Sequence, residues 1–313
     1  YEDVKAALKR TDVFSNDFAE ELTPQRKNPE ATKVLMQGWA PENTLLTLDP
    51  PRHRVYRSLL NKVFSNKRVE GMTDYMVQIV NELMDDWIDE GEVDFLNRFC
   101  VPFPIFVIAD LLGVPRDKLD KVKYWSDCFG SSLSQFADEE KELEDAKAIL
   151  EFQRYFAGRV EELRVNPEDN IISDLAQARI DDDRLLTMEE ILSIIQQLMV
   201  AGNETSRATI AAGVQYLIEN PAEFDKLEAD PSLIPNAVEE ILRLATPSCG
   251  LWRKVIADTE LAGVAIPKGS MLMVRFASAD RDEAVFEDPD SFDIERENAG
   301  DNLAFGQGVH FCV

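Results

Sequence analysis

Three short groups of residues carry side chains that could do chemistry. The first is the loop at residues 305–313, in which Cys312 follows Gly306, Gly308 and His310. A cysteine sulfur is reactive, and it binds metals as a thiolate, while glycines allow the backbone beside it to bend tightly. Taken alone, a turn followed by a buried structural cysteine is the simpler interpretation of such a loop.

The second group interrupts an apolar helix pattern in the middle of the chain. Glu204 and Thr205 follow Gly202, and apolar residues recur at helical spacing on both sides of them. Because glycine weakens a helix and a threonine hydroxyl can bond the carbonyl four residues earlier, a local widening or kink is expected here. Such distortions are frequent at functional sites, and a polar patch that faces solvent is the alternative.

The third group consists of two polar pairs at helical spacing. His53 and Arg57 follow a proline-rich helix start and lie on one face, so both can reach one anion. Glu240 and Arg243 are spaced to pair in another helix. Exposed polar faces and ion pairs of little energetic value would give the same patterns.

A mainly α fold with a small β region must position these residues. Apolar spacing predicts helices at 1–10, 69–90, 95–112, 143–165, 188–218 and 235–244. The longest begins at a capping box, with Thr187 as N-cap and Glu190 at the third helical position. Strand patterns follow at 251–255, 259–261 and 270–276, whereas 11–48 and 286–302 show little periodicity.

Charge excludes several classes of protein. A net charge of −26 over 313 residues opposes general binding to nucleic acid or anionic membranes. One segment, 52–68, is basic and without acidic residues; it is either a solvated helix face or a docking patch for an acidic partner, and its cations are Arg52, Arg54, Arg57, Lys62, Lys67 and Arg68.

Other features indicate the compartment and the extent of the chain. The uncharged stretch at 191–203 is too short to span a bilayer. Four scattered cysteines predict neither a disulfide framework nor a zinc knuckle, and a reducing cytoplasm fits best. Since the first residues lack an initiator Met and an apolar signal region, the sequence is expected to begin inside a domain.

Together these stretches resemble the cytochrome P-450 superfamily of haem-thiolate monooxygenases, of the soluble bacterial type. The resemblance covers essentially the whole chain. It rests on motifs that occur in the family's order: Ala201-Gly202-Asn203-Glu204-Thr205, Glu240-x-x-Arg243, Phe292-Asp293-Ile294-x-Arg296 and Phe305-Gly306-x-Gly308-x-His310-x-Cys312. The family pattern continues beyond the cysteine, so the resemblance implies one catalytic domain over residues 1–313 that is incomplete at both ends.

The resemblance implies a haem site. Haem b (iron protoporphyrin IX) would be bound by the Cys312 thiolate as axial ligand, with Phe305 covering that face. The haem propionates would be bound by charge-assisted donors, namely His53, Arg57, Arg253 and His310. Both histidines of the chain fall at such positions.

The remaining motifs imply catalysis, scaffold and substrate. Thr205 and Glu204 would deliver protons to oxygen on the opposite haem face. Glu240, Arg243 and Arg296 would form a buried structural network beneath the haem. A mainly apolar lining implies a lipophilic substrate, with parts of 23–46 and the following residues forming the pocket: Gln197, Val200, Ala201, Ser248, Cys249, Gly250 and Leu251.

Electrons must come from a separate protein, because the chain shows no flavin or nicotinamide motif. The resemblance implies an acidic ferredoxin docking near 52–68, with NAD(P)H used only indirectly through a ferredoxin reductase. Three alternatives remain open: a peroxide-driven haem-thiolate peroxygenase, a non-catalytic haem-binding sensor, and an all-helical scaffold without a cofactor.

Overall fold

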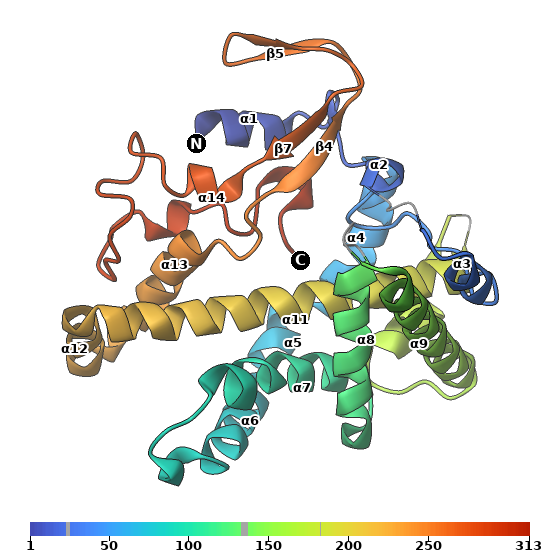
Figure 1. The fold of residues 1–313 in the computed structure, drawn as a ribbon, viewed down its shortest axis with the longest axis horizontal. Helices are drawn as coiled ribbons and strands as arrows, with labels where there is room; N and C mark the ends of the chain where they lie inside the picture. The colour runs from blue at the N-terminus through green and yellow to red at the C-terminus, as the bar shows by residue number, and fades with distance from the viewer. Residues whose placement is uncertain (23–25, 133–136, 182) are drawn as a thin grey trace. The chain divides into compact units, whose positions relative to one another are not determined.

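The computed structural model describes residues 1–22, 26–132, 137–181 and 183–313. The described chain forms two compact units (Figure 1), and each is considered by itself. Unit 1 contains Tyr1–Phe18 and Thr205–Cys312, and unit 2 contains Ala19–Glu204 together with Val313. The boundary lies within one continuous helix, α11 (Met188–Glu219), between Glu204 and Thr205.

Unit 2 is almost entirely helical. Its α-helices before α11 are α2 (Ala19–Leu22), α3 (Pro29–Leu35), α4 (Arg52–Val63), α5 (Asn66–Glu70), α6 (Thr73–Asp85), α7 (Pro102–Leu111), α8 (Leu119–Ser132), α9 (Glu139–Val165) and α10 (Ile171–Gln177). Shorter elements are the 3-10 turns η1 (Ile88–Glu90) and η3 (Arg116–Lys118), the π-helix η2 (Leu96–Cys100), and a hairpin of β2 (Arg179–Ile180) with β3 (Arg184–Leu185).

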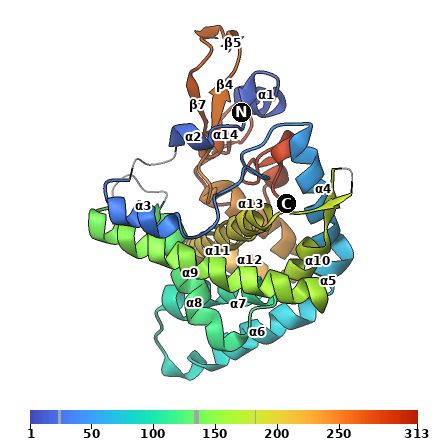
Figure 2. The same ribbon diagram turned by 90° about the vertical axis from the view of Figure 1, so that its right-hand side faces the viewer.

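The core of unit 2 is built where α9 packs against α3 and α8 (Figure 2). Trp125 and Phe129 of α8 meet Phe152 and Phe156 of α9 with ring centroids 4.8–5.9 Å apart, mostly edge to face. All four side chains are at most 1% exposed. Edge-to-face aromatic contacts add to the stabilisation that burial already gives, so these rings fix α8 against α9.

The predicted capping box at the start of α11 is confirmed. The N–H of Glu190 donates to Thr187 Oγ1 (3.3 Å), and the N–H of Thr187 donates to Glu190 Oε2 (2.7 Å). From there α11 is α-helical at every residue through Glu219. The widening expected near Gly202 therefore does not take the form of a change in helix type.

Unit 1 combines helices with small antiparallel sheets. Its helical elements are α1 (Glu2–Lys9), α12 (Pro221–Ala229), α13 (Ile234–Ala245), α14 (Phe276–Ala279) and the 3-10 turns η4 (Pro231–Leu233), η5 (Ala299–Asp301) and η6 (Gly308–His310). Its strands are β1 (Phe14–Ser15), β4 (Leu251–Val255), β5 (Thr259–Leu261), β6 (Val264–Ile266) and β7 (Met271–Val274).

The larger sheet of unit 1 has the order β1-β4-β7, and β5 pairs with β6 in a separate hairpin (Figure 1). Phe14 opposes Val255, and Leu251 opposes Val274. These residues pack with α1 and α14 into an apolar cluster that includes Leu303, just before the cysteine loop. The sheet thus anchors the segment that leads to Cys312.

Sequence patterns located most elements and missed some. The helix predicted at 69–90 is divided into α5, α6 and η1, and the one predicted at 95–112 into η2 and α7. The segment 11–48, predicted without regular structure, contains β1, α2 and α3, while residues 23–25 lie outside the described chain. The segment 286–302 is coil except for η5.

Candidate functional site

The cysteine loop is a tight turn that depends on its glycines. Gly306 and Gly308 have φ of +69° and +79°, a conformation that other residues rarely adopt. The N–H of Cys312 donates to the carbonyl of Phe305 (3.0 Å), which closes the loop on itself. Cys312 is exposed, and Phe305 is 45% exposed.

Gly308 also allows the loop to approach α1. A Cβ at Gly308 would lie 3.0 Å from the backbone oxygen of Leu8, closer than nearly all real Cβ contacts. His310 ends the single 3-10 turn η6, and the cysteine follows two residues later in backbone without regular secondary structure. A side chain at position 308 would therefore crowd the backbone of α1, so glycine suits this part of the cysteine loop.

Arg253 lies in the middle of β4, the central strand of the larger sheet. Its side chain is only 2% exposed, and Nη1 donates to the carbonyl of Trp252 (2.7 Å). A buried guanidinium is costly unless it is matched by polar or anionic groups. Such a group is a suitable donor for a carboxylate ligand.

His53 and Arg57 lie on α4, whose start is held by a buried carboxylate. Glu190 accepts a hydrogen bond from the Tyr56 hydroxyl (2.6 Å) and from Arg52 (3.5 Å). Burial lowers the pKa of His53, and the charge of Arg57 lowers it further. His53 is therefore a neutral donor near pH 7, and Arg57 supplies the positive charge.

Arg184 completes this buried site. It donates to both oxygens of Glu190 at 2.8 Å, and these contacts hold the pKa of Glu190 at about 2 despite the opposing effect of burial. The Glu190 site joins α4, the β2–β3 hairpin and α11 within unit 2. It thereby fixes the helix that presents His53 and Arg57.

Glu204 and Thr205 occupy the middle of α11 and are both partly buried. The carbonyl of Thr205 accepts a hydrogen bond from Thr209 Oγ1 (2.9 Å). The preceding residue, Asn203, is 2% exposed and donates from Nδ2 to Ser126 Oγ of α8 (3.1 Å). In unit 2, this buried contact fixes α11 immediately before Glu204.

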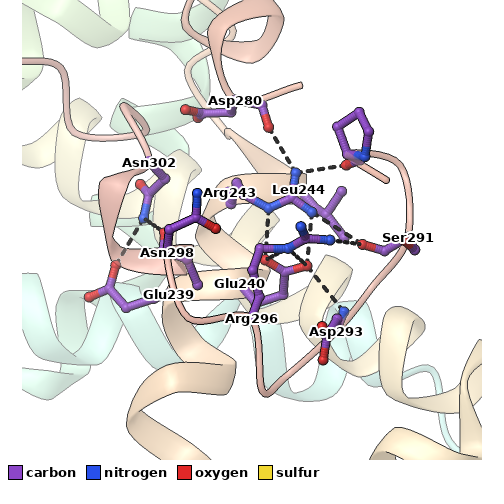
Figure 3. Close-up of polar contacts among 12 residues, drawn as sticks. Glu239, Glu240, Arg243, Leu244, Asp280, Ser291, Asp293, Arg296, Asn298 and Asn302 are labelled. Carbon is purple, nitrogen blue, oxygen red and sulfur yellow. Dashed lines mark hydrogen bonds and ion pairs between the residues drawn. The ribbon is translucent and has the colours of Figure 1, made fainter. Parts of the chain in front are cut away.

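Glu240, Arg243 and Arg296 meet in the interior of unit 1 (Figure 3). Arg243 donates to Glu240 from Nε (2.7 Å) and Nη2 (2.8 Å), and Arg296 Nε lies 3.1 Å from both Glu240 oxygens. The Nη1 and Nη2 atoms of both guanidinium groups also donate to backbone carbonyls, those of residues 280, 287, 288, 289 and 291. The network therefore organises a coil whose own backbone hydrogen bonds are limited to turns and the short element η5.

The residues predicted to line a substrate pocket divide between the units. In unit 2, Gln197 donates to Thr44 Oγ1 (2.7 Å) and accepts from the N–H of Leu46 (3.2 Å), while Val200 is partly buried and Ala201 exposed. Gln197 thus holds the loop before α4. The sequence analysis, which placed Gln197 in the substrate pocket, did not predict this structural contact.

In unit 1, the predicted lining residues Ser248, Cys249, Gly250 and Leu251 lead into β4. The carbonyl of Cys249 accepts from Ala277 (3.2 Å), and Leu251 pairs with Val274. A Cβ at Gly250 would lie 2.3 Å from the backbone oxygen of Val274. Gly250 is thus explained by the close approach of two backbones.

Sequence reasoning missed two buried polar residues of unit 1, Thr246 and Asp280, each 0% exposed. Burial raises the pKa of Asp280 to about 6. Asp280 lies 34 residues from Thr246, with which it shares a hydrogen bond, and no spacing rule links them. The one local signal was Pro247, which ends α13 and lacks an N–H.

The described chain combines a mainly helical fold, small antiparallel sheets and a cysteine loop with two left-handed glycines, and solved structures of cytochrome P-450 enzymes share this fold. The sequence model of the cytochrome P-450 family matches residues 1–313, and the chain belongs to this family. The predicted fold class and the predicted kind of enzyme, an oxidoreductase that incorporates oxygen, are confirmed.

Relatives are bacterial. The chain is 34% identical over 269 residues to a steroid C26-monooxygenase of Mycobacterium tuberculosis, covering 86% of this chain and 72% of that protein. It is 38% identical over 267 residues to the 6-deoxyerythronolide B hydroxylase of Saccharopolyspora erythraea, covering 85% and 65%. The structure of cytochrome P-450 CREJ in complex with (4-ethylphenyl) dihydrogen phosphate matches with a TM-score of 0.90 at 30% identity, covering 100% and 78%.

Proposed function

We propose that this chain is a monooxygenase that inserts one oxygen atom of O2 into a lipophilic small molecule, by hydroxylation or epoxidation. The observation that carries the proposal is the Cys312 loop, with its left-handed Gly306 and Gly308. It is supported by membership of the cytochrome P-450 family, whose haem is bound through a cysteine thiolate. Haem b bound in this way supplies oxygen activation.

The donor set fits haem b. An exposed thiol on a glycine loop suits iron, and the neutral and cationic donors suit two propionates. In the proposal Cys312 binds the iron and Phe305 covers the ring beside it. The propionates are bound by His53, Arg57, Arg253 and His310, while Glu240, Arg243 and Arg296 hold the scaffold around the cysteine loop.

The proposal gives Glu204 and Thr205 the movement of protons. The Thr205 hydroxyl can donate one proton and accept another, and the Glu204 carboxylate can take protons from solvent. Thr205→Ala removes the hydroxyl without enlarging the side chain. In the full-length enzyme it should reduce product formed per electron and increase release of peroxide, and unchanged product yield would refute this role.

Carbon monoxide binding tests the iron ligand. The reduced full-length protein should show the strongly red-shifted Soret band of thiolate ligation, and Cys312→Ser should lose it. A sensor would show the same band but form no product with reductant and oxygen. A peroxygenase would form product with peroxide and no reductase, and the intact Glu204-Thr205 pair favours the reductase-driven reaction.

A lipophilic substrate is proposed because the predicted lining residues are mainly apolar. The named substrates of two relatives, a steroid and 6-deoxyerythronolide B, support this class. In this proposal Gln197 acts by holding the loop at Thr44 and Leu46. The other proposed lining residues are Val200, Ala201, Ser248, Cys249, Gly250 and Leu251.

A ferredoxin, reduced by a ferredoxin reductase that uses NAD(P)H, is the proposed electron donor. Of the basic segment, Arg52 pairs with Asp181, and Arg68 pairs with Asp169 (3.1 Å) and Asp174 (2.9 Å). Three further cations of the segment are exposed, namely Arg54, Lys62 and Lys67.

Charge reversal at these three positions should slow ferredoxin-dependent reduction and weaken its dependence on salt. Reversal at Lys123, which is exposed and paired with Asp127 on α8, is the control. Equal effects at both places would refute docking at this segment.

None of the described helices is long and apolar enough to cross a membrane. The wide spacing of the four cysteines, which form no Cys-x-x-Cys pair, supports the proposed cytoplasmic location.

A further inference from the structure

Asp280 lies where two functional segments of unit 1 are held together. Its Oδ1 accepts the N–H of Leu303 (2.6 Å), at the start of the segment that leads to Cys312. Its Oδ2 lies 3.0 Å from Thr246 Oγ1, at the end of α13. Its backbone oxygen accepts from Arg243 Nη1 (2.8 Å). Asp280 therefore joins α13 to the cysteine-bearing segment.

The Thr246 hydroxyl has two acceptors within hydrogen-bond distance and only one proton. Thr246 Oγ1 lies 2.7 Å from the carbonyl oxygen of Arg243 as well as 3.0 Å from Asp280 Oδ2, and a hydroxyl has a single proton to donate. The helical donor for the Arg243 carbonyl would be the N–H four residues later, at Pro247, which has none. If Thr246 donates to this carbonyl, the hydrogen bond to Asp280 needs a proton on the carboxyl group.

The backbone of Thr246 shows what this arrangement holds in place. Its φ of +34° is a left-handed conformation that is unusual for a β-branched residue. Such strain persists only where the surroundings fix it. The side-chain bonds at Thr246 Oγ1 provide that restraint, and the chain continues directly into Ser248–Leu251 and β4.

We propose that Asp280 is a positioning residue, which carries a proton on Oδ2 and thereby holds the end of α13 and the segment leading to Cys312 in fixed positions relative to each other. The proton donates to Thr246 Oγ1, the Thr246 proton goes to Arg243 O, and Oδ1 accepts from Leu303. When the carboxyl ionises, Thr246 must turn its proton to Asp280, which leaves the Arg243 carbonyl without this donor.

The surrounding charges decide when the proton is lost. Burial raises the pKa of Asp280 to about 6, although the hydrogen bonds with Leu303 and Thr246 oppose this shift, as do the nearby cations Arg243 and Arg281. The Tyr1 phenol interacts electrostatically with the same carboxyl. An unfolded aspartate titrates near pH 4 (about 3.9). The folded state therefore retains the proton more strongly between about pH 4 and 6, and its stability falls as the pH rises through that range.

Asp280→Asn is the decisive variant because its amide oxygen can accept from Leu303 and its NH2 group can donate to Thr246 without titrating. Infrared spectra of the full-length protein should show a protonated carboxylic acid band at pH 5 that is lost on raising the pH and is absent from this variant. The stability advantage of the variant over wild type should grow as the pH rises from about 4 to 7. Asp290→Asn, at a side chain 86% exposed, is the matched control.

Hydrogen exchange tests the positioning role. Asp280→Ala removes the acceptor for the Leu303 N–H, so the Leu303 amide should exchange faster. Asp280→Asn keeps an acceptor and should leave that exchange unchanged. A wild-type band that persists in Asp280→Asn, or a stability difference that is constant with pH, would overturn the proton assignment. Unchanged exchange at Leu303 in Asp280→Ala would overturn the positioning role. The functional meaning of holding the Cys312 segment rests on the proposed haem binding. The infrared, stability and exchange measurements do not depend on haem binding, so the role of Asp280 and the proposed function can fail separately.

Discussion

Glu240→Gln should be among the most damaging substitutions of similar size in this protein. Glu240 is 0% exposed and accepts from Arg243, Arg296 and the N–H of Asp293 (3.1 Å). A glutamine offers one oxygen, and its NH2 group would face guanidinium donors. Two cations, 0% and 8% exposed, would lose their counter-charge. Breaking a buried pair in this way costs roughly 3–5 kcal/mol.

Glu30→Gln is a matched control. Glu30 also pairs with a basic residue three positions later, Lys33 (2.5 Å), but these side chains are 61% and 68% exposed. The same change there should cost at most about 0.5 kcal/mol, because solvent screens exposed pairs. Against a total stability on the order of 5–15 kcal/mol, only Glu240→Gln should reduce the yield of folded, haem-containing protein.

Urea unfolding of the full-length proteins, followed by both haem absorbance and far-ultraviolet circular dichroism, measures the difference. The double variant Glu240→Gln with Arg296→Met should lose less free energy of unfolding than the sum of the two single variants, since Arg296→Met removes one buried cation that would lack its counter-charge. If Glu240→Gln costs no more than Glu30→Gln, the network is not a buried electrostatic support and the reasoning is wrong.

Two further substitutions test local features. Arg184 and other donors hold the pKa of Glu190 at about 2, so its carboxylate stabilises the folded wild type above about pH 4.5, and this stabilisation is lost as the pH falls toward 2. Glu190→Gln should lack this stabilisation at every pH. Comparing acid unfolding of both proteins checks the prediction. Gly250→Ala should lower the thermal unfolding midpoint, since its Cβ would lie 2.3 Å from the Val274 oxygen. Gly130→Ala should not lower it, because among the described residues a Cβ there has no neighbour within 4 Å beyond its own helix backbone and its two chain neighbours; equal midpoints would contradict this expectation.

Local sequence rules predicted what depends on neighbours in the chain. The capping box at Thr187 and Glu190 has the expected reciprocal bonds because both residues lie within one helical turn. The spacing of Glu240 and Arg243 placed them on one face for the same reason. The burial of this pair could not be read from spacing, because exposed helices carry identical pairs, as Glu30 and Lys33 show.

Contacts between distant parts of the sequence were not predictable in this way. Arg68 was predicted only as one cation of the basic segment 52–68, and the sequence did not indicate its partners Asp169 and Asp174, about a hundred residues later. Gly38 gave no signal either, although a Cβ there would lie 2.0 Å from Gln153 Oε1, whose amide binds the backbone of Trp39. Such partners are brought together by tertiary packing, which periodicity does not encode.

The coil before the cysteine loop shows how one helix can substitute for regular structure. Along α13, both Glu239 and Glu240 lie three or four residues from Asn236 on one side and from Arg243 on the other, which places these residues on neighbouring positions of one helix surface. Asn236 donates to the carbonyls of residues 294 and 296, Glu239 accepts from Asn302 (2.9 Å), and Arg243 donates to the carbonyls of residues 280, 289 and 291. A buried backbone must satisfy its polar groups, and here side chains do so where strands would otherwise be needed. The coil can therefore have a fixed position although its sequence is aperiodic, because the regularly spaced side chains of α13 hold it in place.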